Sequence, residues 1–280
     1  MLFQFQLRPI DDIVPWGSEG DYSLSWFGLT DGWYWLKCGE EELFRYADSV
    51  LASRKYEGRQ QADPPYVDYQ VVRLWEDVLE MLPEILTPVP VELLRKIEPG
   101  LDAWRWRGQI AELAFPNEDE ISQSMEAHFN LATTWLQGRK LDVLHPKEGP
   151  RIWFWTDGTK MFIRWDNTEL TMDGRSVWAS TKGTYSMPLA TFIEEIESFD
   201  RRLIETMGQR VQAIQHSWDR PLIKIDQEAL LREQRERANA LAEAFQRVKD
   251  CEQTPWNTIA KSIAYFEEQG FPLPKMSAQL

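Results

Sequence analysis

SLSWFGLTDGWYWLKCGEEELFRY, residues Ser23 to Tyr46, is the stretch around which we expect the fold to form. It places Asp31-Gly32 between two aromatic runs. This dipeptide is the strongest short-range signal for a β-hairpin, because a type I′ turn needs positive φ at both central residues. Strand alternation then puts one set of side chains on a shared face, which we expect to meet the core: Phe27, Leu29, Tyr34, Leu36 and Cys38.

The opposite face of this expected hairpin carries three tryptophans, Trp26, Trp33 and Trp35. A monomer seldom exposes so large an apolar surface. Two interpretations are therefore open: other parts of the chain cover the tryptophans, or the tryptophans form a recognition surface. We take all three as candidate binding residues, because tryptophan anchors carry much of the binding energy in protein interfaces.

A second aromatic run, RIWFWTDGTKMFIRWD from Arg151 to Asp166, repeats the Thr-Asp-Gly turn. With Asp157-Gly158 as a two-residue loop, Phe154 stands opposite Met161. We expect this second hairpin to lie beside the first one in a single antiparallel sheet.

Helices are expected mainly after the first hairpin and at the end of the chain. Leu189 to Trp218 gives the clearest pattern, with apolar residues at three- and four-residue spacing along one stripe. Val67 to Leu86 is a second helix, with Asp68 as its expected N-cap. Asp226 to Cys251 is a third. Grouped strands and runs of helices predict an α+β fold, an antiparallel sheet of two aromatic hairpins packed by the long helix.

Arg220-Pro221 interrupts the helical pattern and suggests a boundary. We predict a core domain over 1–219 and a C-terminal helical extension over 220–280 that packs on it. Those last helices are also where a homo-oligomer could form.

The chain is strongly acidic, with 31 Lys and Arg, 45 Asp and Glu, and a net charge of −14. This charge repels nucleic-acid backbones and anionic lipid and favours basic partners. Residues 1–50 contain nine acidic and three basic residues. Residues 108–138 contain acidic residues but no Lys or Arg. The second stretch forms either a solvated surface or part of a binding site. Its candidate binding residues are Glu118, Asp119 and Glu120.

The compartment follows from what the sequence lacks. Cys38 and Cys251 are the two cysteines, which gives no disulfide framework and suits a reducing cytoplasm. The N-terminal sequence MLFQFQLRPIDD has no basic region followed by a long apolar run, so we expect no signal peptide. No apolar run approaches the length of about 18 residues that spans a bilayer. We expect a cytoplasmic protein with no membrane partner.

A search for catalytic motifs assigns no catalytic residue. The three histidines, His128, His145 and His216, form no HExxH or HxxxH pair, and no G-x-S-x-G elbow, P-loop or G-x-G-x-x-G is present. We therefore expect no metal and no cofactor. A hydrolase remains an alternative, because two of the 45 acids could meet in a tryptophan-lined cleft.

Several segments together resemble a family of uncharacterised bacterial proteins, a domain of unknown function. The resemblance covers about residues 1–215 and brings no catalytic residue with it. Small acidic cytoplasmic proteins of this build are often immunity partners of toxins, an association by type. The segments are Leu29-Thr30-Asp31-Gly32-Trp33-Tyr34-Trp35, Leu43-Phe44-Arg45-Tyr46, Tyr66-Val67-Asp68-Tyr69, Val72-Arg73-Leu74-Trp75-Glu76-Asp77 and Phe199-Asp200-Arg201-Arg202-Leu203, with Met207 and Arg210-Val211.

Charge, tryptophan content and the empty motif search lead to one main expectation. The chain is a non-enzymatic acidic binding protein, in one form an immunity protein that covers a basic toxin domain. The alternatives are an oligomeric structural or interaction subunit and the carboxylate-using hydrolase.

Overall fold

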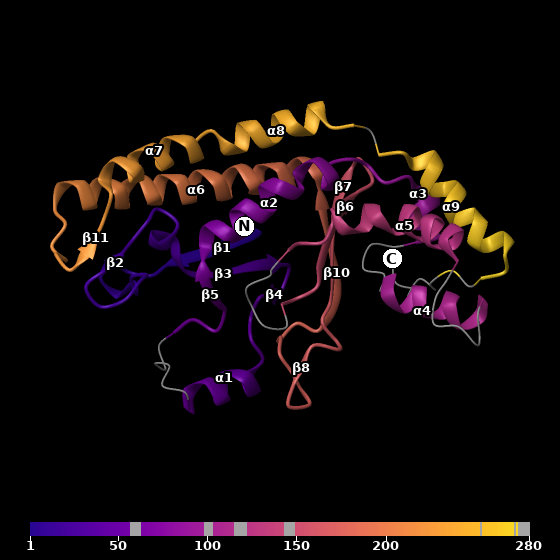
Figure 1. The fold of residues 1–280 in the computed structure, drawn as a ribbon, viewed down its shortest axis with the longest axis horizontal. Coiled ribbons are helices and arrows are strands. Elements are labelled where there is room, and N and C mark those ends of the chain that lie inside the picture. Colours follow the sequence, from indigo (N-terminus) through magenta and orange to yellow (C-terminus); the bar gives the residue numbers. More distant parts are fainter. Residues whose placement is uncertain are drawn as a thin grey trace.

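The computed structural model describes residues 1–56, 63–97, 103–114, 122–142, 149–252, 254–271 and 273, and it confirms the α+β fold (Figure 1). The strands are β1 (Phe3–Leu7), β2 (Tyr22–Ser23), β3 (Asp31–Cys38), β4 (Glu41–Leu43), β5 (Val67–Gln70), β6 (Ile152–Thr156), β7 (Lys160–Asp166), β8 (Thr171–Met172), β9 (Arg175–Ser176), β10 (Lys182–Pro188) and β11 (Ile223–Lys224). The α-helices are α1 (Asp48–Tyr56), α2 (Val71–Ile85), α3 (Val91–Leu94), α4 (Ala103–Ala114), α5 (Gln123–Gln137), α6 (Leu189–His216), α7 (Gln227–Arg237), α8 (Ala240–Asp250) and α9 (Trp256–Glu268).

The first sheet is built around β3. β1 pairs antiparallel with one edge of β3, with Phe5 opposite Tyr34. The other edge of β3 pairs antiparallel with both β4 and β5, and Val67 of β5 also lies opposite Tyr34. The helix expected from Val67 is therefore a strand followed by α2, and Asp68 is a strand residue rather than an N-cap.

The prediction of a hairpin turn at Asp31-Gly32 is wrong. Gly28–Thr30 forms a short 3-10 helix, and Asp31 already begins β3. Gly32 has no positive φ; it is needed because a Cβ there would lie 2.3 Å from the Gln6 carbonyl oxygen in β1. The two-residue turn comes later, where Gly39 (φ +66°) connects β3 to β4. The glycine thus serves a long-range contact that the local pattern does not reveal.

The second hairpin is confirmed as β6 and β7, with a different register. Phe154 lies opposite Ile163 rather than Met161. The turn is longer than two residues, because the Asp157 carboxylate accepts hydrogen bonds from the backbone N–H groups of Thr159 and Lys160. This hairpin forms a separate sheet in the order β10-β7-β6, so the two aromatic stretches do not share one sheet.

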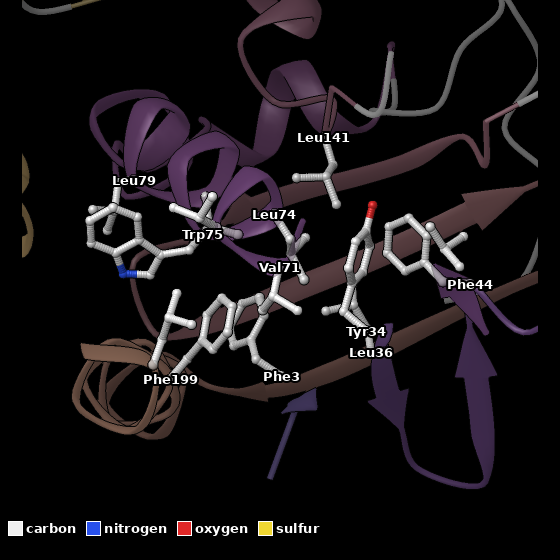
Figure 2. Packing of buried hydrophobic residues seen from close by; sticks show 14 of the residues in the cluster. Phe3, Tyr34, Leu36, Phe44, Val71, Leu74, Trp75, Leu79, Leu141 and Phe199 are labelled. Carbon is white, nitrogen blue, oxygen red and sulfur yellow. The ribbon is translucent and has the colours of Figure 1, made fainter. Parts of the chain in front are cut away.

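The long helix α6 joins the two sheets. Its buried stripe contacts β1 through Phe199, which stacks on Phe3 at 5.2 Å, and contacts β6 through Phe192, 6.0 Å from Phe154. Figure 2 shows Phe3 and Phe199 side by side near α2, with Trp75 beside them. Leu189 and Ile193, at the start of the predicted stripe, are half-buried. The other predicted residues are buried: Phe192, Ile196, Phe199, Leu203, Met207, Val211 and Ile214.

Polar side chains of α6 also bind the backbone near the edge strand β1. Glu195 accepts a hydrogen bond from the Leu2 N–H at 2.6 Å, and Arg202 donates to the Phe3 carbonyl at 2.6 Å. Arg210 donates to the carbonyls of Leu29, at 2.6 Å, and Arg8. An open sheet edge exposes unpaired backbone groups, and here the helix satisfies the Phe3 carbonyl in β1 and one backbone group at each end of that strand.

The C-terminal helices pack along the rest of the chain. The helix expected over Asp226–Cys251 is two helices, α7 and α8, which lie against α6 and α2 (Figure 1). Helix α9 packs on α5. Trp153 and Trp155, on one face of β6, pack with α4, α5 and α9 in a second core. This core also includes Trp106, Phe129, Ile263 and Phe266. The boundary at residue 219 stays a prediction.

Candidate functional site

Trp26 and Trp33 lie inside the protein. The Trp26 side chain is fully buried; its Nε1 donates to Gln234 Oε1 at 2.7 Å, and the Arg237 guanidinium lies 4.5 Å from its ring. Trp33 is buried beneath the Arg8 guanidinium, which lies 4.3 Å from its ring. For these two residues the prediction of an open recognition face is wrong, because α7 and the segment after β1 cover them.

Trp35 is half-buried on the first sheet. Its ring stacks on Tyr66 with centroids 4.1 Å apart and an angle of 7° between the planes. Burial and a hydrogen bond to Glu42 raise the pKa of Tyr66 to about 12, so the phenol stays protonated. One face of Trp35 is thus occupied by the chain itself.

The other three predicted binding residues are acids of the 108–138 stretch. Glu118, Asp119 and Glu120 lie outside the described residues, and so does His145. Their role as binding residues stays a prediction. His128, which is described, lies 3.3 Å from the Ser262 hydroxyl and stacks on Tyr265, contacts that hold α5 against α9.

Two carboxyls with raised pKa values lie on and beside α2, and no catalytic motif in the sequence includes them. Trp75 Nε1 donates to Asp200 at 3.0 Å, and burial raises the pKa of Asp200. Asp77 is buried, with Oδ1 3.1 Å from Arg73 and Oδ2 without a hydrogen-bond partner in the described part of the chain. Burial raises its pKa to about 7 against the opposing effect of Arg73. The only sequence signal was that both aspartates lie in segments of the family resemblance, Trp75-Glu76-Asp77 and Phe199-Asp200-Arg201.

An open groove of about 600 Å³ runs between α2 and the pair α7 and α8. At its wall, Arg237 binds both Glu76, at 2.7 Å, and Glu233, at 2.9 Å. General acid–base hydrolysis needs one protonated and one ionised carboxyl facing a substrate. Both glutamates are bound by this one arginine, and neither Asp77 nor Asp200, the two carboxyls whose pKa values burial raises, lines the groove. The groove is therefore lined by the ion pairs of Arg237 and by apolar side chains that include Trp75 and Leu79.

The N-terminal region concentrates negative charge. Between Arg8 and Lys37 the sequence has five acids and no Lys or Arg. Two of these acids are compensated: Arg8 binds Asp31 at 2.9 Å, and Lys224 binds Asp21 at 2.7 Å. The others are Asp11, Asp12 and Glu19.

We define the acidic corner as Asp11, Asp12, Glu19 and Asp219, all exposed. Across the described ranges no ion pair involves any of these four carboxylates. The nearby cation Arg220 is turned inward, with its guanidinium donating to the carbonyls of Ile10 at 3.1 Å and Ile13 at 3.4 Å. The corner therefore shows uncompensated negative charge to solvent.

The described residues contain no group of three or more His, Cys, Asp or Glu side chains placed to hold a metal ion. Within the same residues, no helix has the length and apolar character needed to cross a membrane.

The comparisons place this α+β chain in a family. The chain belongs to DUF5984, a family of unknown function, whose model matches residues 2–262. The match extends beyond the expected 215 residues and includes α7, α8 and most of α9. No curated protein and no solved structure matches the chain.

Proposed function

We propose that this protein is a non-enzymatic binding protein that captures a basic protein in the cytoplasm, and that it serves as an immunity protein for a basic toxin domain. The observation that carries the proposal is the acidic corner, where Asp11, Asp12, Glu19 and Asp219 are exposed without a cation partner among the described residues. The net charge of −14 adds to the same field.

Uncompensated surface charge acts on association more than on the lifetime of a complex. A negative field accelerates the encounter with a positive surface, and it suppresses encounters with other acidic proteins. Salt screens such a field over about 10 Å at 0.1 M. A partner captured in this way must therefore bind more slowly as the ionic strength rises.

The test uses purified basic proteins encoded by genes beside the gene for this chain, each produced separately. We expect one of them to bind the full chain, and we expect co-expression with the chain to restore growth to cells that produce it. The association rate should fall at least about tenfold between low salt and about 0.3 M salt.

Charge variants locate the effect. Asp11→Asn, Asp12→Asn and Glu19→Gln together should slow association at low salt by about tenfold. The matched control carries Glu112→Gln, Glu243→Gln and Glu92→Gln, three exposed acids away from the corner, and should bind nearly as the parent chain does. If association slows equally in both variants, the total net charge and not the position of the corner governs the association rate. If no basic neighbour binds or is neutralised, the proposed function is overturned.

A further inference from the structure

The acidic corner also carries exposed apolar side chains. Trp16 is 55% exposed, Val14 77% and Leu222 81%. Trp16 is the one exposed tryptophan among those whose side chains the structure describes. Exposed apolar side chains that cluster in one region with polar residues around them mark interaction sites, whereas isolated ones are common on any protein surface. We name Val14, Trp16 and Leu222 the apolar anchors.

Backbone hydrogen bonds hold the three anchors on one small scaffold. Trp16 and Ser23 exchange two of these bonds, at 2.8 and 2.9 Å. Ser23 lies in β2, which pairs in parallel with β11, and Leu222 directly precedes β11. The Arg220 guanidinium binds the Ile13 carbonyl next to Val14. Figure 1 shows β2 and β11 together at the end of the molecule opposite α9.

Side-chain contacts connect the scaffold to its neighbours. The Trp16 ring meets Phe27 edge to face, with centroids 6.1 Å apart and an angle of 90° between the planes. The Trp218 Nε1 donates to the Ile223 carbonyl at 3.0 Å, which ties the end of α6 to β11. A surface that is already ordered loses less conformational entropy when a partner binds.

The charges around the anchors select the kind of partner. Asp11, Asp12, Glu19 and Asp219 would repel nucleic-acid phosphates and anionic lipid headgroups. A second copy of the chain would bring the same carboxylates against each other in an isologous interface. A basic protein with an apolar recess meets both the anchors and the carboxylates with complementary groups.

We propose that the apolar anchors insert into an apolar recess on the basic partner while the acidic corner forms the charged rim of that interface. This inference rests on the proposed function and adds the place of contact to it. The anchors then set the dissociation rate, and the carboxylates set the association rate.

The experiment measures binding kinetics with the basic neighbour protein that the full chain binds. In the full chain, Trp16→Ala with Leu222→Ser should weaken the equilibrium affinity by about 30-fold, mostly through faster dissociation. The matched control is Val91→Ser, which changes an exposed apolar residue on α3 and should leave the affinity within about twofold. Circular dichroism and thermal unfolding check that all variants fold as the parent chain does.

Each further outcome has a definite meaning. Tight binding by the parent chain with unchanged affinity in the Trp16→Ala, Leu222→Ser variant overturns this inference and leaves the proposed function intact. A parent chain that binds no basic neighbour overturns both. A dimer in sedimentation that the same variant dissociates, or binding of the parent chain to vesicles of anionic phospholipid, would assign the surface to another occupant and overturn the inference.

Discussion

Asp77 shows what burial does to a single carboxyl in this fold. Its side chain is 2% exposed, and the cation in contact with it is Arg73, at 3.1 Å. The other charges that act on it are acids, Glu76, Glu80 and Asp142. Burial is the largest cause and raises the pKa from 3.8 to about 7. The carboxyl is therefore protonated in the folded protein over a pH range in which the unfolded chain would ionise it.

The consequence is a falling stability with rising pH. Below about pH 4 both states hold the proton, whereas between about pH 4 and 7 only the folded state does. This group therefore lowers the free energy of unfolding as pH rises through that window, by up to about 4 kcal/mol. Urea unfolding of the parent chain and of Asp77→Asn over this range measures the difference. The Asp77→Asn curve should be flatter, and parallel curves would contradict the prediction.

The tryptophans show why residue burial was hard to foresee. Strand alternation puts Phe154 and Trp155 of β6 on opposite faces, and the two residues do lie in different cores. It could not say what covers each face. Trp26 is covered by Gln234 and Arg237, which lie more than 200 positions later in the sequence. A local pattern holds no information about a contact of that range.

At the scale of elements, α6 has two separate roles. Its apolar stripe packs against both sheets, and the 3.6-residue period made that stripe predictable. Its polar residues Glu195, Arg202 and Arg210 bind backbone groups in and near β1. The second role was not predictable, because every residue has a backbone carbonyl and the residue types do not show which one a distant side chain will bind. The Phe199–Leu203 segment thus combines packing with closure of a sheet edge.

The edge contact predicts a difference between two neighbouring arginines. Arg202 donates to the Phe3 carbonyl and its guanidinium lies 5.2 Å from the Phe5 ring, whereas Arg201 is exposed. Arg202→Ala should lower the free energy of unfolding by about 1.5–3 kcal/mol. Arg201→Ala should change it by less than about 0.5 kcal/mol. Urea unfolding measures both values.

Hydrogen exchange adds a local readout to this comparison. The amides of residues 2–8 should exchange faster in Arg202→Ala, because the edge of β1 loses one of its attachments to α6. The same amides should be unchanged in Arg201→Ala. Equal protection in the two variants would mean that the Arg202 hydrogen bond is not needed to hold β1 against α6.

Two Asp-Gly dipeptides show how much structure the local sequence can predict. At Asp157-Gly158 the turn is made by nearby groups, so the sequence signal was correct and only the register was missed. At Asp31-Gly32 the same dipeptide occupies a strand, because Gly32 allows β1 to approach within contact of its backbone. The excess of acids in residues 1–50 was visible in the sequence. Both the position of Asp219 beside them and the exposure of Trp16 depend on the arrangement of segments from both ends of the chain.

At the scale of the whole molecule, the C-terminal helices complete both cores. Helix α7 supplies the contacts that cover Trp26. Helix α9 supplies Ile259, Ile263 and Phe266 to the second core, and Trp256 lies 5.3 Å from the buried Arg139 guanidinium. The family match also spans residue 219.

This arrangement predicts that a chain ended after residue 219 will not fold as a cooperative unit. Burial of each large apolar side chain stabilises a protein by about 1.5–3 kcal/mol. Loss of the three α9 side chains alone removes about 5–9 kcal/mol, comparable with the total stability of a typical domain. The shortened chain should bind a hydrophobic dye and unfold without a sharp thermal transition. A chain ended after residue 273 keeps every described residue and should unfold as the full chain does. A sharp transition with native near-ultraviolet dichroism in the 1–219 chain would instead establish residue 219 as a domain boundary.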